Sequence, residues 1–154
     1  MKKFDRSLIP PVPDLAFESS LWAQGVVWVA GIDEAGRGAL AGPVCAAAIL
    51  LPPSRHMAAV LCGVRDSKQM TPAERHLWAG RLRGLAAAYG VGFAGASEID
   101  AIGIAPATRL AMRRALDELC LPPQHLLVDY LPLPEIALPQ TSLVKCDARS
   151  LSIA

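Results

Sequence analysis

Aromatic residues are scarce in this sequence, at 5% of 154 positions, and there is no internal repeat or low-complexity tract. With so few large rings, a core must be built mainly from Ala, Leu, Val and Ile. Hydrophobic residues nonetheless make up 53% of the chain and charged residues only 19%. This composition excludes an intrinsically disordered protein, and the length suits one domain rather than two.

A strong excess of either charge is also missing, because the formal net charge is +1. This balance excludes a long basic or acidic tail that binds partners by charge alone. The charges are nevertheless segregated: residues 1–36 sum to −2, residues 37–114 to +6 and residues 115–154 to −3. We expect the basic middle segment to supply a face that attracts phosphates.

Features of exported, membrane-bound and zinc-binding proteins are missing as well. The first residues, MKKFDRSLIPPVP, contain no apolar signal-peptide core, and the longest uncharged stretch, residues 38–54, is interrupted by three prolines. Cysteines form no CxxC pair, and no histidine follows at zinc spacing. We therefore expect a cytoplasmic protein without membrane association, with reduced cysteines packed in the core. These cysteines are Cys45, Cys62, Cys120 and Cys146.

The order of apolar runs predicts an α/β fold with a mixed central sheet flanked by helices. Residues 1–24, which contain three prolines, are expected to form an extended lead-in. One predicted helix runs from a capping box at Thr71 to about Tyr89, and another covers residues 106–119. The short link between the first two strands favours an antiparallel pair. The predicted strands are 26–33, 43–51, 91–96 and 126–129.

Acidic residues stand at the ends of three apolar runs. Asp33 and Glu34 end the first, Asp129 ends LLVD, and Asp147 follows LVK. Side chains at the carboxyl ends of strands face a shared crevice, where unpaired carboxylates raise one another's pKa. A divalent cation removes that repulsion, and oxygen ligands without Cys or His favour Mg²⁺ or Mn²⁺. Two such ions roughly 4 Å apart are suited to in-line cleavage of a phosphodiester.

Each acid also has an ordinary structural interpretation, since Asp after a strand is commonly a turn residue or a helix cap. The metal hypothesis rests on coincidence: the pair Asp33-Glu34 lies between an apolar strand and a Gly-x-Gly turn, and LLVD repeats the strand-then-acid pattern.

Two loops allow alternative interpretations. Gly36-Arg37-Gly38 is either a tight turn that needs positive φ or a backbone that approaches a ligand closely, with Arg37 on a phosphate. The loop Asp66-Ser67-Lys68 is either solvated or holds a phosphate through Ser67 and Lys68.

The segment GIDEAGRGALAGPVCAAAIL, residues 31–50, resembles ribonuclease HII, the type 2 ribonuclease H family. This motif is specific because it fixes the acids, the turn and the next strand together. The resemblance covers residues 25–154, and the later motifs arrive in the family's order. They are DSK at 66–68, IDAIGIAPATRLAMRRAL at 99–116, LLVD at 126–129 and KCDARSLSIA at 145–154.

The resemblance implies a ribonuclease H-like catalytic domain over residues 25–154. It implies an endoribonuclease that uses Mg²⁺ or Mn²⁺ to cleave the RNA strand of RNA–DNA hybrids and to cut at ribonucleotides embedded in duplex DNA. We expect the protein to be a monomer. The family's four metal-binding acids correspond to Asp33, Glu34, Asp129 and Asp147. Its Gly-Arg-Gly turn senses the ribose 2′-hydroxyl, which implies that role for Gly36, Arg37 and Gly38.

The chain departs from the family pattern at four places. Tyr130 follows the third acid and Cys146 precedes the fourth, where the family usually has Gly, so both would place side chains beside the metal site. Residues 103–105 are Gly-Ile-Ala where the family commonly has Asn-Ile-Leu. The family also continues past SLSIA into more helix, including a Tyr that packs against the sugar at the cleavage site. We therefore expect a C-terminally truncated chain.

Three functional hypotheses follow. The first is a metal-dependent endoribonuclease, and the second is a catalytically incomplete nucleic-acid-binding fragment of the same family. The third is another ribonuclease H-like nuclease, such as a resolvase or integrase core. The DEAGRG turn argues against the third, because an enzyme that cuts only DNA needs no 2′-hydroxyl sensor.

Overall fold

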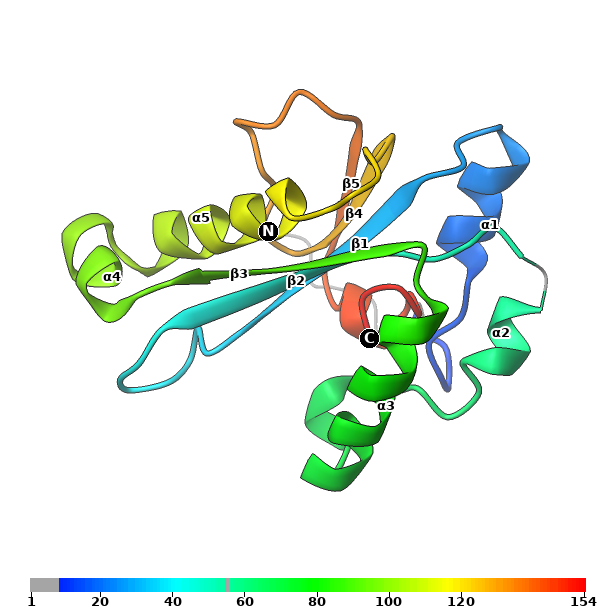
Figure 1. Cartoon of the computed structure of the whole chain (residues 1–154), viewed down its shortest axis with the longest axis horizontal. Helices are drawn as coiled ribbons and strands as arrows, with labels where there is room; N and C mark the ends of the chain where they lie inside the picture. The colour runs from blue at the N-terminus through cyan, green and yellow to red at the C-terminus, as the bar shows by residue number, and fades with distance from the viewer. Residues whose placement is uncertain (1–8, 55) are drawn as a thin grey trace.

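A five-stranded mixed sheet in the order β3-β2-β1-β4-β5 organises the chain (Figure 1). The computed structural model describes residues 9–54 and 56–154. β1 pairs antiparallel with β2 and parallel with β4, which confirms the mixed sheet and the antiparallel first pair. The strands are β1 (Val29–Ala35), β2 (Val44–Leu50), β3 (Ala88–Ala94), β4 (His125–Asp129) and β5 (Gln140–Leu143).

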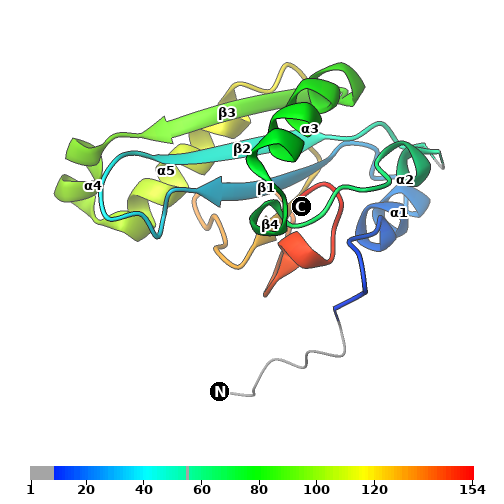
Figure 2. The same cartoon turned by 90° about the horizontal axis from the view of Figure 1, so that it is seen from below.

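Helix α5 (Ile104–Asp117) covers one face of the sheet, whereas α3 (Pro72–Leu85) lies in front of the other face (Figure 2). Glycines at positions 90 and 92 of β3 lie beneath α5, and a Cβ at either would collide with the helix backbone. Small residues thus let helix and sheet approach closely, which is how a core with few aromatics is filled. The fully buried residues of α5 are Ala107, Thr108, Ala111, Met112 and Ala115.

The other face of β1 and β4 is covered by the last residues of the chain and by α1 (Ala16–Ala23). A Cβ at Gly31 would overlap the backbone of Ser152, so the C-terminal segment lies directly on β1. Phe17 and Leu21 of α1 pack against the same cluster. The buried members of this cluster are Val29, Leu127, Cys146 and Ile153.

Two predicted boundaries are wrong. Residues 16–23 form a helix where the sequence predicts an extended lead-in, and residues 1–8 of that lead-in lie outside the described residues. Helix α3 has the predicted capping box at Thr71 but ends at Leu85 rather than near Tyr89. The reason is that residues 88–90 pair with β2, so β3 begins three residues before its predicted start.

Short helices complete the fold, and none of the helices in the described ranges is long and apolar enough to cross a membrane. All four cysteines are free thiols, but Cys62 and Cys120 are exposed rather than packed in the core as predicted. The short elements are α2 (Met57–Val60), η2 (Ser67–Gln69), α4 (Ala96–Ile102) and η3 (Cys146–Ala148).

Candidate active site

Strand periodicity places Asp33 and Asp129 on the same face of the sheet. Ile32 and Val128 point into the core under α5, so the residue after each points to the opposite face. Ile32 and Val128 are also the last pair in the parallel ladder between β1 and β4. Asp33 and Asp129, the next residue on each strand, therefore lie side by side at the carboxyl ends of neighbouring strands.

Asp147 reaches this edge through a hydrogen bond that joins the end of β4 to η3. The backbone N–H of Cys146 donates to Asp129 Oδ1 at 2.7 Å, and Asp147 is the next residue, itself only 8% exposed. The Cys146 side chain is fully buried against Val29 and Leu127. This departure from the family pattern therefore packs into the core instead of facing the acids.

Burial and mutual repulsion raise the pKa of two of these carboxyls. The pKa of Asp33 rises to about 7, mainly because the group is buried, although the Glu34 N–H donates to its Oδ1 at 2.8 Å. The nearby charges of Glu34 and Asp129 add to the rise. Burial also raises the pKa of Asp129, with contributions from Asp147 and Glu34. Burial, with the neighbouring negative charges added, therefore favours the protonated form of both carboxyls.

Two basic side chains pair with the other two acids. Lys68 Nζ lies 3.0 Å from Asp147 Oδ2, and this hydrogen bond is the main cause of the raised pKa of Lys68. Arg37 Nη1 lies 3.5 Å from Glu34 Oε1, whereas Glu34 Oε2 is buried with no hydrogen-bond partner in the described part of the chain. Asp147 and Glu34 are thus each paired with a cation, whereas burial raises the pKa of Asp33 and of Asp129.

The donor chemistry of this edge fits a hard cation, although the side chains do not form a closed coordination shell. Within residues 9–54 and 56–154, no three Asp, Glu, His or Cys side chains are grouped tightly enough to hold a metal ion. The Oε2 atom of Glu34 is nevertheless an unpartnered oxygen ligand, and a bound cation would offset the burial and the neighbouring charges that raise the pKa of Asp33.

The loop before α3 presents Lys68 but not Ser67. Asp66 is the N-cap of η2, and its Oδ1 accepts the Lys68 backbone N–H at 2.9 Å. Ser67 is exposed and does not line the cleft, and its carbonyl oxygen accepts a hydrogen bond from Arg75. Of the two side chains predicted to bind phosphate, Lys68 therefore faces the cleft and Ser67 does not.

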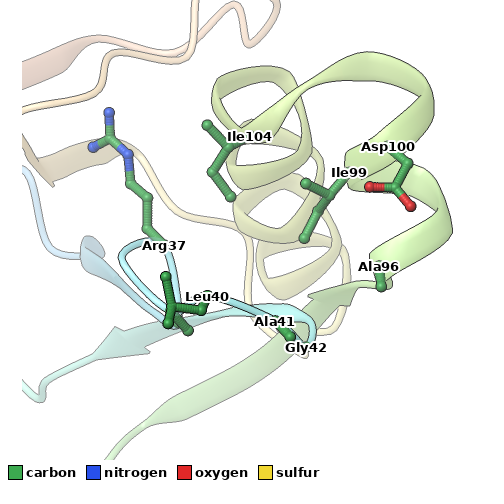
Figure 3. Close-up of a pocket in the computed structure, with 10 residues that line it drawn as sticks. Arg37, Leu40, Ala41, Gly42, Ala96, Ile99, Asp100 and Ile104 are labelled. Atoms are coloured by element: carbon green, nitrogen blue, oxygen red, sulfur yellow. The ribbon is translucent and has the colours of Figure 1, made fainter.

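A cleft of about 480 Å³ is lined by two of the four acids, Asp129 and Asp147, and a second hollow of about 470 Å³ adjoins it. Arg37 lines both. Figure 3 shows Arg37 and Leu40 on the loop after β1, with Ile99 and Ile104 of α4 and α5 across the second hollow. The lining of the first cleft includes Arg37, Lys68, Asp129, Tyr130, Lys145 and Asp147.

The glycines of the Gly-Arg-Gly turn differ in what the backbone requires of them. Gly36 has φ +92°, and a Cβ there would lie 2.7 Å from the Pro43 carbonyl oxygen. Gly38 has no positive φ and no neighbour within 4 Å of an added Cβ. The backbone conformation of the turn therefore requires glycine at position 36 but not at position 38.

Sequence reasoning missed a buried acid in α1. Glu18 is 1% exposed, and its Oε1 accepts hydrogen bonds from the hydroxyls of Ser150 and Ser152, each at 2.6 Å. Asp14 adds a backbone bridge to Ser150. Helix α1 therefore ties down the segment that follows Asp147. No local pattern predicts this, because Ser150 is 132 positions from Glu18.

A model of the family described as Ribonuclease HII matches residues 30–154. The chain belongs to the ribonuclease HII family. It is 54% identical over 142 residues to a ribonuclease HII of Synechococcus sp. (strain JA-3-3Ab), covering 92% of this chain and 63% of the relative. It is 49% identical to one of Dehalococcoides mccartyi (strain ATCC BAA-2266 / KCTC 15142 / 195), covering 92% and 67%. The chain thus spans about two thirds of the length of these relatives.

Solved structures of ribonucleases H2 and HIII share the fold. The crystal structure of the ribonuclease H2 from Pyrococcus horikoshii OT3 matches with a TM-score of 0.65 and 26% identity, covering 79% of this chain and 64% of that one. A Bst-RNase HIII in complex with Mn²⁺ matches with a TM-score of 0.61 and 20% identity, covering 87% and 52%. The predicted ribonuclease H-like α/β fold is therefore confirmed.

Proposed function

We propose that this chain is a metal-dependent endoribonuclease that cleaves the RNA strand of RNA–DNA hybrids and cuts at ribonucleotides embedded in duplex DNA. The observation that supports this most directly is the position of Asp33 and Asp129. They follow the last pair of the ladder between β1 and β4, and Asp129 lines a cleft together with Asp147, Arg37 and Lys68. Membership of the ribonuclease HII family supports the same activity.

Asp33, Glu34, Asp129 and Asp147 would hold two ions, either Mg²⁺ or Mn²⁺. The free Oε2 of Glu34 and the raised pKa values of Asp33 and Asp129 support this assignment. The Mn²⁺ in the related ribonuclease HIII structure supports the choice of ion. Held there, such ions would lower the pKa of water for attack on the phosphodiester and offset the negative charge that develops on the phosphate.

The basic side chains of the cleft would then bind the substrate. Lys68 and Arg37 pair with Asp147 and Glu34, and metal binding by these acids would release both cations toward phosphates. We assign the turn Gly36-Arg37-Gly38 to sensing the ribose 2′-hydroxyl, because it resembles the family's Gly-Arg-Gly turn, and Arg37 lines both hollows. Ser67 is exposed and does not line the cleft, so its hydroxyl would contact the duplex outside the cleft.

The test is cleavage of duplex DNA that carries one ribonucleotide, beside an all-DNA duplex, with Mg²⁺, with Mn²⁺ and with EDTA. We expect cleavage only where both ribonucleotide and metal are present. Asp129→Asn should lower the rate by about a hundredfold or more. The matched control Asp117→Asn, exposed on the last turn of α5, should leave it unchanged.

The alternative is a catalytically incomplete fragment that binds nucleic acid. Binding of the ribonucleotide duplex without cleavage in either metal would favour it over the enzyme. Equal cleavage of the all-DNA duplex would contradict the proposed specificity.

A further inference from the structure

Tyr130 has a strained backbone conformation at the edge of the cleft. Its φ is +56°, and Lys145 is the only other non-glycine residue with positive φ among those described. Both line the same cleft as Asp129 and Asp147. A bulky residue rarely adopts this left-handed conformation, and residues held in it cluster at functional sites.

The chain on both sides of Tyr130 enforces this conformation. The Leu131 N–H donates to the Asp129 carbonyl oxygen at 2.6 Å, which closes a three-residue turn centred on Tyr130. Asp129 is anchored by the Cys146 N–H, and the Leu131 side chain is buried. The side chain between these anchors is turned out of the fold, and Tyr130 is 58% exposed.

The exposed ring lies beside the groups that we assign to substrate binding. The Arg37 guanidinium carbon is 5.9 Å from the centre of the Tyr130 ring. The preceding residue in the chain is Asp129, one of the four acids. The ring therefore adds little to the protein core while it occupies the approach to the cleft.

We infer that Tyr130 is a further substrate-binding residue, whose ring packs against the sugar–phosphate backbone of the duplex next to the phosphodiester that is cut. This inference rests on the proposed function. Contact with the backbone does not depend on the identity of the base, so Tyr130 adds affinity without sequence preference. The neighbouring Arg37 guanidinium binds phosphate on the same strand. A glycine at this position would relieve the backbone strain but would remove the contact surface.

Three substitutions separate contact with the duplex from a structural role. Tyr130→Phe keeps the ring, Tyr130→Leu keeps bulk and strain but loses the aromatic face, and Tyr130→Gly loses both ring and strain. We expect Phe to match the wild type, while Leu and Gly raise KM, and Kd for the uncut duplex in EDTA, by about tenfold, because the flat apolar contact with the backbone is lost. The change in kcat should be small, since the chemical groups remain.

Melting temperature and a matched tyrosine provide the controls. Tyr130→Gly should melt no lower than the wild type, because the strain is relieved. Tyr89→Leu, on β3 and outside the cleft lining, should leave KM and Kd unchanged.

The outcomes distinguish this inference from the proposed function. A wild-type chain that cleaves, with Tyr130→Gly showing the same KM, overturns the inference alone. A loss of affinity in Tyr130→Gly that occurs only together with a lowered melting temperature, and not in Tyr130→Leu, also overturns it. If the wild type binds without cleaving, the ratio of the Kd values of Tyr130→Gly and the wild type tests the inference: a ratio near one overturns it, and a ratio of about ten supports it. A wild type that neither binds nor cleaves overturns both.

Discussion

Lys68 and Asp147 are 79 positions apart in the chain, yet Lys68 Nζ lies 3.0 Å from Asp147 Oδ2. The lysine side chain is 71% exposed and the aspartate side chain 11%, so the cation covers the carboxylate from the solvent side. This pair supplies positive charge to an acid that we assign to metal binding. A divalent ion and the lysine should therefore compete for the same carboxylate.

Replacing the lysine tests that competition. Lys68→Met should raise the affinity for Mn²⁺ by about threefold, because a partly exposed ion pair stabilises the metal-free state by at most about 1 kcal/mol. The same change should weaken binding of the duplex. Titration calorimetry with Mn²⁺ measures the first effect. Lys145→Met, which removes a cation from the same cleft that forms no ion pair with the described residues, controls for general charge. Unchanged or weaker Mn²⁺ binding in Lys68→Met would contradict the competition.

The raised pKa of Asp33 predicts how stability depends on pH when metal is absent. Between its ordinary value of 3.8 and about 7, the folded protein keeps a proton that the unfolded chain releases. The free energy of unfolding should therefore fall as pH rises through this window and level off above it. In EDTA, we expect the melting temperature to drop by roughly 5 °C between pH 5 and pH 8.

One substitution and one added metal test whether Asp33 causes this drop in melting temperature. Asp33→Asn mimics the protonated carboxyl and should flatten the profile. Saturating Mn²⁺ should reverse the loss above pH 7, because the metal binds the ionised form. A melting temperature that rises with pH in EDTA, with Asp33→Asn behaving like the wild type, would contradict the assignment.

The buried carboxylate of α1 predicts a large effect on stability. Glu18→Ala would leave the buried hydroxyls of Ser150 and Ser152 without their acceptor, at a cost of about 2–4 kcal/mol of unfolding free energy. Glu18→Gln keeps an acceptor oxygen and should lose less. Glu135→Ala, at an exposed position, is the matched control. Urea denaturation measures all three, and equal stability of Glu18→Ala and Glu135→Ala would be the contrary result.

The strand-then-acid pattern could be seen in the sequence because its physical basis is local. Alternation along a strand decides which face Asp33 and Asp129 share, and the capping box at Thr71 involves residues three apart. Helix α1 could not be predicted in this way, since Glu18 is stabilised by residues near the other end of the chain. The end of α3 was also missed, because pairing of Ala88 with Leu50 overrides helix propensity. The ion pair between Lys68 and Asp147 has no sequence signature, since the fold alone brings the two loops together.

The two glycines of the Gly-Arg-Gly turn should respond differently to alanine. Gly36→Ala places a Cβ 2.7 Å from the Pro43 carbonyl oxygen at φ +92°, so it should destabilise the fold by about 2 kcal/mol whatever the function. Gly38→Ala meets open space and should melt like the wild type. If the turn approaches the ribose closely, however, the added methyl of Gly38→Ala should lower the preference for a ribonucleotide duplex over all-DNA by about tenfold.

This difference makes Gly38 the sharper test of 2′-hydroxyl sensing. A folded Gly38→Ala variant that loses the preference supports sensing by the turn, because no contact within the described residues explains the loss. Gly80→Ala is the control, since Gly80 in α3 also has open space around an added Cβ. A Gly38→Ala variant with normal melting and an unchanged preference would make the turn a structural feature, required only for the backbone at Gly36.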